Sequence, residues 1–247
     1  MTVNKRDAIK AQRTRKKRQQ RINTVLWAGG FILLIIIIFI SPTIYNQLKP
    51  AGSFTKITPV ARPMENGKSI GDPNAKVKIQ IFEDFQCPSC KEFTTSIEPQ
   101  LVASTYITSG QVYYEFMQFP FIDSASVTKE SHQAANASMC ALEQGRFWDY
   151  HDLLFTNQGS VENGGGFTDK RLQVFAQSLG LDMGKFNQCF SANKYSSEID
   201  TEYQQGVSLG VTGTPTVFLN GKTVTPGFVP DYTALKSAID AALAGGG

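Results

Sequence analysis

The stretch DFQCPSCKEF, residues 84–93, holds two cysteines separated by two residues, Cys87 and Cys90. It follows residues 77–81, where apolar and polar side chains alternate as they do in a strand. Pro88 favours the first position of a helix, and apolar residues recur at helical spacing after it. The stretch therefore predicts a strand–loop–helix unit with both cysteines at the start of the helix.

This placement has a chemical consequence for the two thiols. A thiol at a helix start faces unpaired backbone N–H groups and the positive end of the helix dipole, and both favour the thiolate. In Cys-x-x-Cys pairs the thiol pKa falls from about 8.5 to between about 3.5 and 7.5. Because the thiolate attacks disulfides and leaves more readily, we expect Cys87 to exchange with substrate. Cys90, one turn deeper and shielded, is expected to resolve the mixed disulfide.

Two other interpretations of the pair stay open, half of a metal site and a structural disulfide. A metal site usually needs two close pairs of ligands, and Cys140 and Cys189 lie far from each other and from the pair. The two histidines, His132 and His151, form no paired motif, so we predict no metal and take both as ordinary helix residues. A two-residue spacing at a helix start is more typical of redox pairs than of structural ones.

The amino-terminal part of the chain is basic and then strongly apolar. Residues 1–21 hold nine Lys or Arg and one acidic residue, although the whole chain has a net charge of only +3. Residues 25–40, VLWAGGFILLIIIIFI, carry no charge, and with the uncharged residues after them approach the length that spans a hydrocarbon core of about 30 Å. The positive-inside rule then predicts a cytoplasmic arm at 1–21, a transmembrane anchor at 22–45, and a body outside.

A cleaved signal peptide is the alternative interpretation of this segment. Its apolar region is shorter and ends at a small-x-small cleavage site, which we do not find after this run. A basic arm also suits nucleic acid, but membrane topology explains the charge, so no nucleic-acid partner is predicted. All four cysteines lie in the exported body, on the oxidising side of a membrane where disulfides persist.

Three prolines and a lack of apolar periodicity predict a flexible linker over residues 46–70. A folded domain is predicted over residues 71–247. Strand patterns at 111–121 and 214–220 flank a block of helical patterns at about 125–209. This order favours an α/β domain in which helices cover a mixed sheet.

The motif DFQCPSC, followed after the helical block by GVTGTPTVFLNG, resembles the thioredoxin-fold proteins of the DsbA kind, above all their membrane-anchored bacterial members. The resemblance covers roughly residues 70–245. It implies a thioredoxin fold with an inserted helical domain, and thiol–disulfide oxidoreductase activity without a bound cofactor. It also implies a cis proline, Pro215, which with Thr214 and the dipeptide Pro88 and Ser89 forms the substrate-binding site.

The same resemblance implies partners and a second cysteine pair. Exported protein thiols and disulfides are the expected substrates. A DsbB-like or VKOR-like membrane partner that passes electrons to quinone is expected to recharge an oxidant. Some relatives join the residues that match Cys140 and Cys189, which implies a structural disulfide. Two free thiols, or a relay to the catalytic pair, are the alternatives for those residues.

Two departures from the family pattern concern redox tuning. Many relatives carry an acidic residue six positions before the first cysteine, where this sequence has Ile81. Glu83 and Asp84 are close in sequence but expected to differ in direction. Ser89 is uncharged where the strong oxidant of the family has a histidine, which predicts a less oxidising potential. We expect a membrane-tethered, extracytoplasmic enzyme that forms disulfides, with a reductase or a redox-inactive binding or chaperone module as alternatives.

Overall fold

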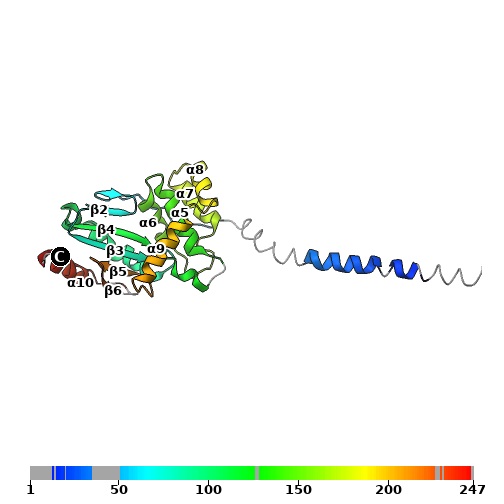
Figure 1. The fold of residues 1–247 in the computed structure, drawn as a ribbon. Coiled ribbons are helices and arrows are strands. Elements are labelled where there is room, and N and C mark those ends of the chain that lie inside the picture. Colours follow the sequence, from blue (N-terminus) through cyan, green and yellow to red (C-terminus); the bar gives the residue numbers. More distant parts are fainter. Residues whose placement is uncertain are drawn as a thin grey trace, which may run out of the picture. The chain divides into compact units, whose positions relative to one another are not determined.

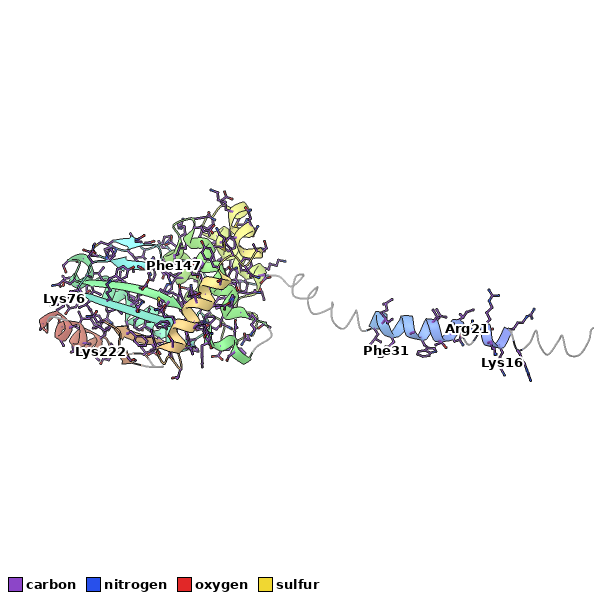
Figure 2. All side chains as sticks on the ribbon, in the orientation of Figure 1. Lys16, Arg21, Phe31, Lys76, Phe147 and Lys222 are labelled. Carbon is purple, nitrogen blue, oxygen red and sulfur yellow. A yellow bond between two sulfur atoms is a disulfide. The ribbon has the colours of Figure 1, made fainter. Side chains whose placement is uncertain are left out.

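The computed structural model describes residues 13, 15–19, 21–34, 51–125, 128–225, 229 and 231–245 (Figure 1). The chain divides into two units, residues 1–50 and 51–247. In the first unit residues 21–34 are helical, and the labelled side chains Arg21 and Phe31 project from this helix (Figure 2).

The predicted membrane anchor, residues 22–45, extends past the described part of this unit. Residues 35–45 lie outside the described residues, as do residues 1–12 of the predicted basic arm. No helix among the described residues combines the length and the apolar character that crossing a membrane requires.

The second unit contains a six-stranded sheet in the order β1-β2-β4-β3-β5-β6. Its strands are β1 (Glu65–Asn66), β2 (Ser69–Gly71), β3 (Val77–Glu83), β4 (Val112–Gln118), β5 (Thr216–Leu219) and β6 (Lys222–Thr225). β3 and β4 run parallel, and the other neighbouring pairs run antiparallel. The predicted mixed sheet is therefore confirmed.

Helices connect and cover these strands. Those between β3 and β4 are α2 (Pro88–Ser96), α3 (Glu98–Val102) and α4 (Thr105–Thr108), which supply the crossover that parallel strands require. Between β4 and β5 lie η1 (Phe121–Ala125), α5 (Glu130–Leu142), α6 (Phe147–Thr156), α7 (Asp169–Ser178), α8 (Met183–Ser191) and α9 (Ser196–Ser208), and α10 (Tyr232–Ala244) ends the chain. α6 packs against α2, the helix that begins at the cysteine pair, and α9 packs against β4. The helical block therefore rests on the sheet (Figure 1).

The alternation in β3 assigns its side chains to two cores. Ile79 and Ile81 are fully buried in the main core, whereas Phe82 belongs to a smaller one. α9 approaches this smaller core at Gly206, where an added Cβ would lie 2.7 Å from the ring of Phe119. Glycine therefore allows α9 to pack closely on the sheet.

The predicted linker, residues 46–70, differs from the structure over its described part, residues 51–70. β1 lies in this segment and β2 begins in it, and β2 pairs with β4 of the sheet. The ring of Phe54 lies 5.2 Å from that of Phe175. These tertiary contacts outweigh the local effect of the prolines, so this part of the segment is folded against the domain rather than forming a flexible tether.

Candidate active site

The cysteine pair sits where the sequence predicts it. Cys87 is the N-cap residue of α2, and Pro88 follows at the first helical position. The Cys87 N–H donates to the Asp84 carbonyl at 3.0 Å, which closes a turn between β3 and the helix. Both cysteines are thiols in this structure. Cys87 retains 8% of its surface exposed and Cys90 none, so Cys87 is the more accessible thiol.

The surroundings of Cys87 stabilise its thiolate and lower the pKa of this thiol to about 6. The largest cause is a hydrogen bond from the Cys90 thiol, and burial opposes it. The N–H groups of Ser89 and Cys90 and the side chain of Thr214 act in the same direction as the Cys90 bond. The N–H contributions come from the helix start that the sequence indicates.

Cys90 has the opposite character. Burial raises its pKa well above the ordinary value, and the hydrogen bond to Cys87 and the charge of Glu83 act in the same direction. The two thiols of one helix turn therefore titrate far apart, which separates a nucleophile from a protonated partner.

The expectation that Glu83 differs in direction from residue 81 is wrong. Ile81 and Glu83 are two residues apart on β3, and alternate residues of a strand share a face. Glu83 is fully buried, and burial raises the pKa of its carboxyl to about 7 against the opposing effect of His151. A buried acid thus lies two residues after position 81 and acts on the Cys90 thiol, and the alternation of side chains along a strand could have placed it.

The predicted substrate-binding residues gather around Cys87. The Thr214–Pro215 peptide bond is cis, and the Cys87 thiol donates to the Thr214 carbonyl at 3.2 Å. Pro88 is exposed and Ser89 partly exposed, whereas Thr214 and Pro215 are buried. Residues far apart in the chain therefore meet at one thiol.

Two polar side chains, Asp84 and Gln158, hold the cysteine loop, and of these Gln158 was not singled out from the sequence. The Asp84 carboxylate accepts hydrogen bonds from the N–H of Gln86 and from the hydroxyl of Ser131 on α5. The Gln158 amide donates to the carbonyl of Phe85 at 2.8 Å and to that of Cys87 at 2.9 Å. Both side chains tie the active-site turn to the helical block.

His151 differs from the ordinary helix residue that the sequence predicts, because it is buried among charged side chains. It is fully buried, and its Nδ1 lies 3.0 Å from Asp152 Oδ1. Glu98, His151 and Asp152 lie close enough to hold a metal ion between them. The Arg62 guanidinium, however, donates to both carboxylates, at 3.1 Å to Glu98 and 2.7 Å to Asp152, so we assign this cluster to ion pairing.

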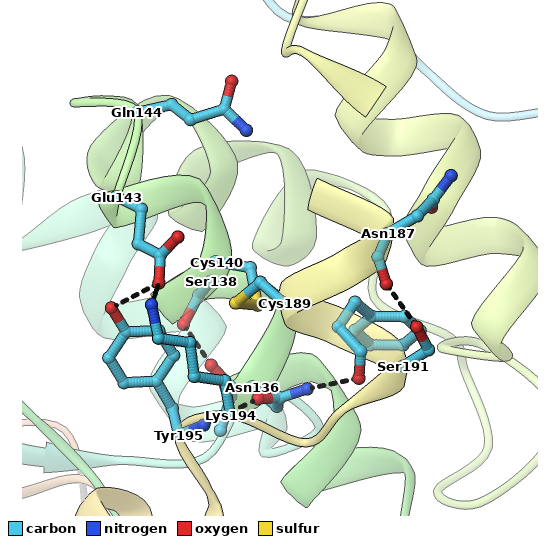
Figure 3. The surroundings of a disulfide bond; sticks show 12 residues. Asn136, Ser138, Cys140, Glu143, Gln144, Asn187, Cys189, Ser191, Lys194 and Tyr195 are labelled. Carbon is cyan, nitrogen blue, oxygen red and sulfur yellow. Dashed lines mark hydrogen bonds and ion pairs between the residues drawn. A yellow bond between two sulfur atoms is a disulfide. The ribbon is translucent and has the colours of Figure 1, made fainter. Parts of the chain in front are cut away.

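The second cysteine pair is a disulfide. Cys140 of α5 and Cys189 of α8 are joined, with their Cα atoms 5.8 Å apart (Figure 3). The amide of Asn136 donates to the carbonyl of Phe190 at 3.1 Å and so adds a second tie between the same two helices. This disulfide lies within the helical block and shares no helix with Cys87 and Cys90.

A family model described as thioredoxin matches residues 64–241, and the chain therefore belongs to the thioredoxin family. A probable disulfide bond formation protein D of Bacillus cereus is 28% identical over 211 residues, which cover 84% of this chain and 90% of that protein. The reduced disulfide bond oxidoreductase DsbG of Mycobacterium tuberculosis is 27% identical with a TM-score of 0.56, covering 72% of this chain and 85% of that one.

The crystal structure of oxidised BdbD from Bacillus subtilis is 24% identical, with a TM-score of 0.63. The match covers 77% of this chain and 100% of that one. It supports the fold. The family model and the two relatives above show that the protein is a thiol–disulfide oxidoreductase of the DsbA type.

Proposed function

We propose that this protein is a membrane-tethered, extracytoplasmic oxidant that forms disulfides in exported proteins through its Cys-Pro-Ser-Cys pair. One observation carries the proposal: the surroundings lower the pKa of Cys87 to about 6 and raise that of Cys90. In the reduced protein Cys87 is then a stabilised thiolate at neutral pH. Stabilising the reduced form makes the disulfide form a stronger oxidant.

The reaction follows from this asymmetry. A substrate thiolate attacks Cys87 Sγ of the Cys87–Cys90 disulfide, and Cys90 leaves with the electron pair and takes a proton. A second substrate thiolate then attacks the substrate sulfur of the mixed disulfide, and Cys87 leaves as its stabilised thiolate. The substrate is oxidised by two electrons and the pair is reduced by two. Recharging runs the same steps backwards, with Cys90 resolving the mixed disulfide.

Glu83 is the proton partner of Cys90 in this proposal. Its pKa of about 7 lets the carboxyl carry a proton or release it near neutral pH. Its charge also acts directly on the buried Cys90 thiol.

The substrate chain is proposed to lie across Thr214 and Pro215 and to contact Pro88 and Ser89. Their position around the Cys87 thiol supports this assignment. The Cys140–Cys189 disulfide is proposed to be structural, because it joins two helices of the block and shares no helix with the redox pair.

The tether and the redox partner rest on the sequence. The basic arm at 1–21 followed by the apolar residues 25–40 supports a single-pass anchor at 22–45 with the enzyme outside. An anchor of this kind holds the enzyme near a DsbB-like or VKOR-like membrane protein linked to quinone. Alkylation of introduced cysteines on each side of sealed vesicles tests this topology. An externally labelled residue in the arm would contradict it.

The reduction potential of the Cys87–Cys90 pair decides the direction of electron flow. We would equilibrate the full-length protein in detergent with glutathione buffers, alkylate free thiols and read the redox state by mass. A value within several tens of millivolts of about −120 mV identifies a disulfide donor, and one near −270 mV a reductase. A value well below about −300 mV would make the pair structural, as in a binding or chaperone module.

A further inference from the structure

Buried charged side chains extend from Glu83 toward the surface of the domain, and the reaction described above leaves most of them without a role. His151 lies at their centre. Its Nε2 is 4.0 Å from Glu83 Oε2 and 3.8 Å from Glu98 Oε2, and its Nδ1 is 3.0 Å from Asp152 Oδ1. Asp152, which is 21% exposed, lines a groove of about 750 Å³ that opens to solvent. His151 thus stands between the acid of the active site and a solvated carboxylate.

Glu83 is not needed for charge balance in this cluster, because two cations already face two carboxylates. Arg62 donates to Glu98 and Asp152, so one guanidinium and one imidazolium face two carboxylates. Glu83 is the remaining carboxyl, and neither of its oxygens has a hydrogen-bond partner among the described residues. His151 lies beside this carboxyl, with its Nε2 at 4.0 Å from Glu83 Oε2, at ion-pair distance and beyond that of a hydrogen bond. Burial raises the proton affinity of this carboxyl, and an opposite charge beside it acts against that rise.

We propose that His151 is a positioning residue of the thiol–disulfide reaction: its imidazolium faces Glu83 and keeps this carboxyl able to accept and return the Cys90 proton at neutral pH. The inference rests on the proposed function of Glu83 as the proton partner of Cys90. It extends that function from Glu83 of β3 to a residue of α6 that touches neither sulfur nor substrate.

The charge states of the two residues support this arrangement. Burial works against the charge of His151, but Glu98 and Asp152 outweigh it and raise the pKa of the imidazole to about 9. At neutral pH His151 is therefore a cation while Glu83 titrates at about 7. The other titratable or charged groups that face the pair are Cys87 and Cys90 of the redox turn, Glu98 of α3, Tyr114 of β4, Asp152 of α6 and Arg62 before β1.

The step on which His151 acts is the closing of a mixed disulfide at Cys87. Ionised Glu83 takes the Cys90 proton, and the Cys90 thiolate attacks Cys87 Sγ. The Cys87–Cys90 bond forms as the bond to the outside sulfur breaks, and that sulfur leaves as a thiolate with the electron pair. His151 forms no bond in this step. It stabilises the ionised Glu83 that must be present before the proton moves.

The test measures the closing rate against pH. Reduced full-length protein in detergent is mixed with oxidised glutathione and quenched with acid at set times, and mass separates the glutathione adduct from the closed disulfide. In His151→Gln the pH midpoint of closing is expected to rise by about one unit, because an opposite charge this close lowers a carboxyl pKa by about 1–3 units. Closing at pH 7 is then about fivefold slower.

His132→Gln is the matched control. His132 is partly exposed on α5, and its Nε2 lies 3.5 Å from Asp200 Oδ1, outside the cluster. We expect the wild-type midpoint in this variant. A second variant, Asp152→Asn, keeps the imidazole and weakens its positive charge, so a smaller shift in the same direction is expected. This variant keeps the inference testable if His151→Gln fails to fold.

The Glu83→Gln background separates positioning from a structural effect. If His151 acts through Glu83, adding His151→Gln to Glu83→Gln moves the pH profile no further. An equal shift in both backgrounds, or an unchanged midpoint in folded His151→Gln, overturns the inference. If wild-type protein forms no glutathione adduct at all, the proposed redox function fails instead, so the two failures are distinguishable.

Discussion

The two cysteine pairs of this chain are buried alike, yet their surroundings favour opposite chemistry. No cysteine exposes more than 8% of its surface. Cys87 and Cys90 occupy the start of α2, at the positive end of a helix dipole. Cys140 and Cys189 lie in the last turns of α5 and α8, where the dipole disfavours a thiolate. Position along a helix therefore separates the two pairs, and the hydrogen bond from Cys90, the largest cause of the lowered Cys87 pKa, adds to this difference.

The largest effect is expected from Cys87→Ser. Thiol–disulfide exchange should fall by more than about a thousandfold, because a hydroxyl replaces the only thiolate that substrate reaches. The rate of oxidation of a dithiol peptide, followed by acid quench and mass, measures this. The double variant Cys140→Ala/Cys189→Ala is the control and should keep the wild-type rate. A matching loss of rate in the control would indicate that the second pair relays electrons.

The second-largest effect is expected on stability, and here the second cysteine pair matters rather than the first. Cys140→Ala/Cys189→Ala opens a loop with a sequence separation of 49 residues. By the chain-entropy estimate its free energy of unfolding should fall by about 4 kcal/mol. Urea unfolding of this variant and of wild type, both with Cys87 and Cys90 reduced, measures the difference. A loss below about 1 kcal/mol would mean that the disulfide contributes little to the fold.

A third prediction concerns the pH dependence of the reduced protein. The pKa of Cys87 in the folded state, about 6, lies below that of about 8.5 in an unfolded chain, so ionisation favours folding. This stabilisation is complete above about pH 8.5 and disappears as the pH falls through about 6. Relative to reduced Cys87→Ser, reduced wild type should gain about 3 kcal/mol across this window in urea unfolding. Parallel pH curves for the two proteins would contradict the assignment.

The smallest effect is expected from an ion pair beside the Cys140–Cys189 disulfide. Lys194 pairs with Glu143 beside Cys140 and Cys189, but more than half of its side chain is exposed (Figure 3). Lys194→Ala should therefore lower the free energy of unfolding by less than about 0.5 kcal/mol. Urea unfolding gives the value. A loss above about 1 kcal/mol would show that this surface ion pair, and not only the covalent bond, holds the helices.

Much of the fold was predictable because its signals are local. The alternation before Cys87 and the proline after it specify β3 and α2, and the structure has both. The segment at 51–70 was predicted wrongly for the same reason. Its prolines are a local signal, whereas the pairing of β2 with β4 depends on residues far along the chain.

By itself the sequence determined the place of Cys87 and Cys90 at a helix start, since adjacent residues carry that information. Only the tertiary structure decided which charged groups surround the buried carboxyl of Glu83. Glu83, His151 and Arg62 come from β3, α6 and the segment before β1, and they meet only in the folded domain. The pKa of a buried group depends on desolvation and on the charges around it, and both are set by packing rather than by neighbours in sequence.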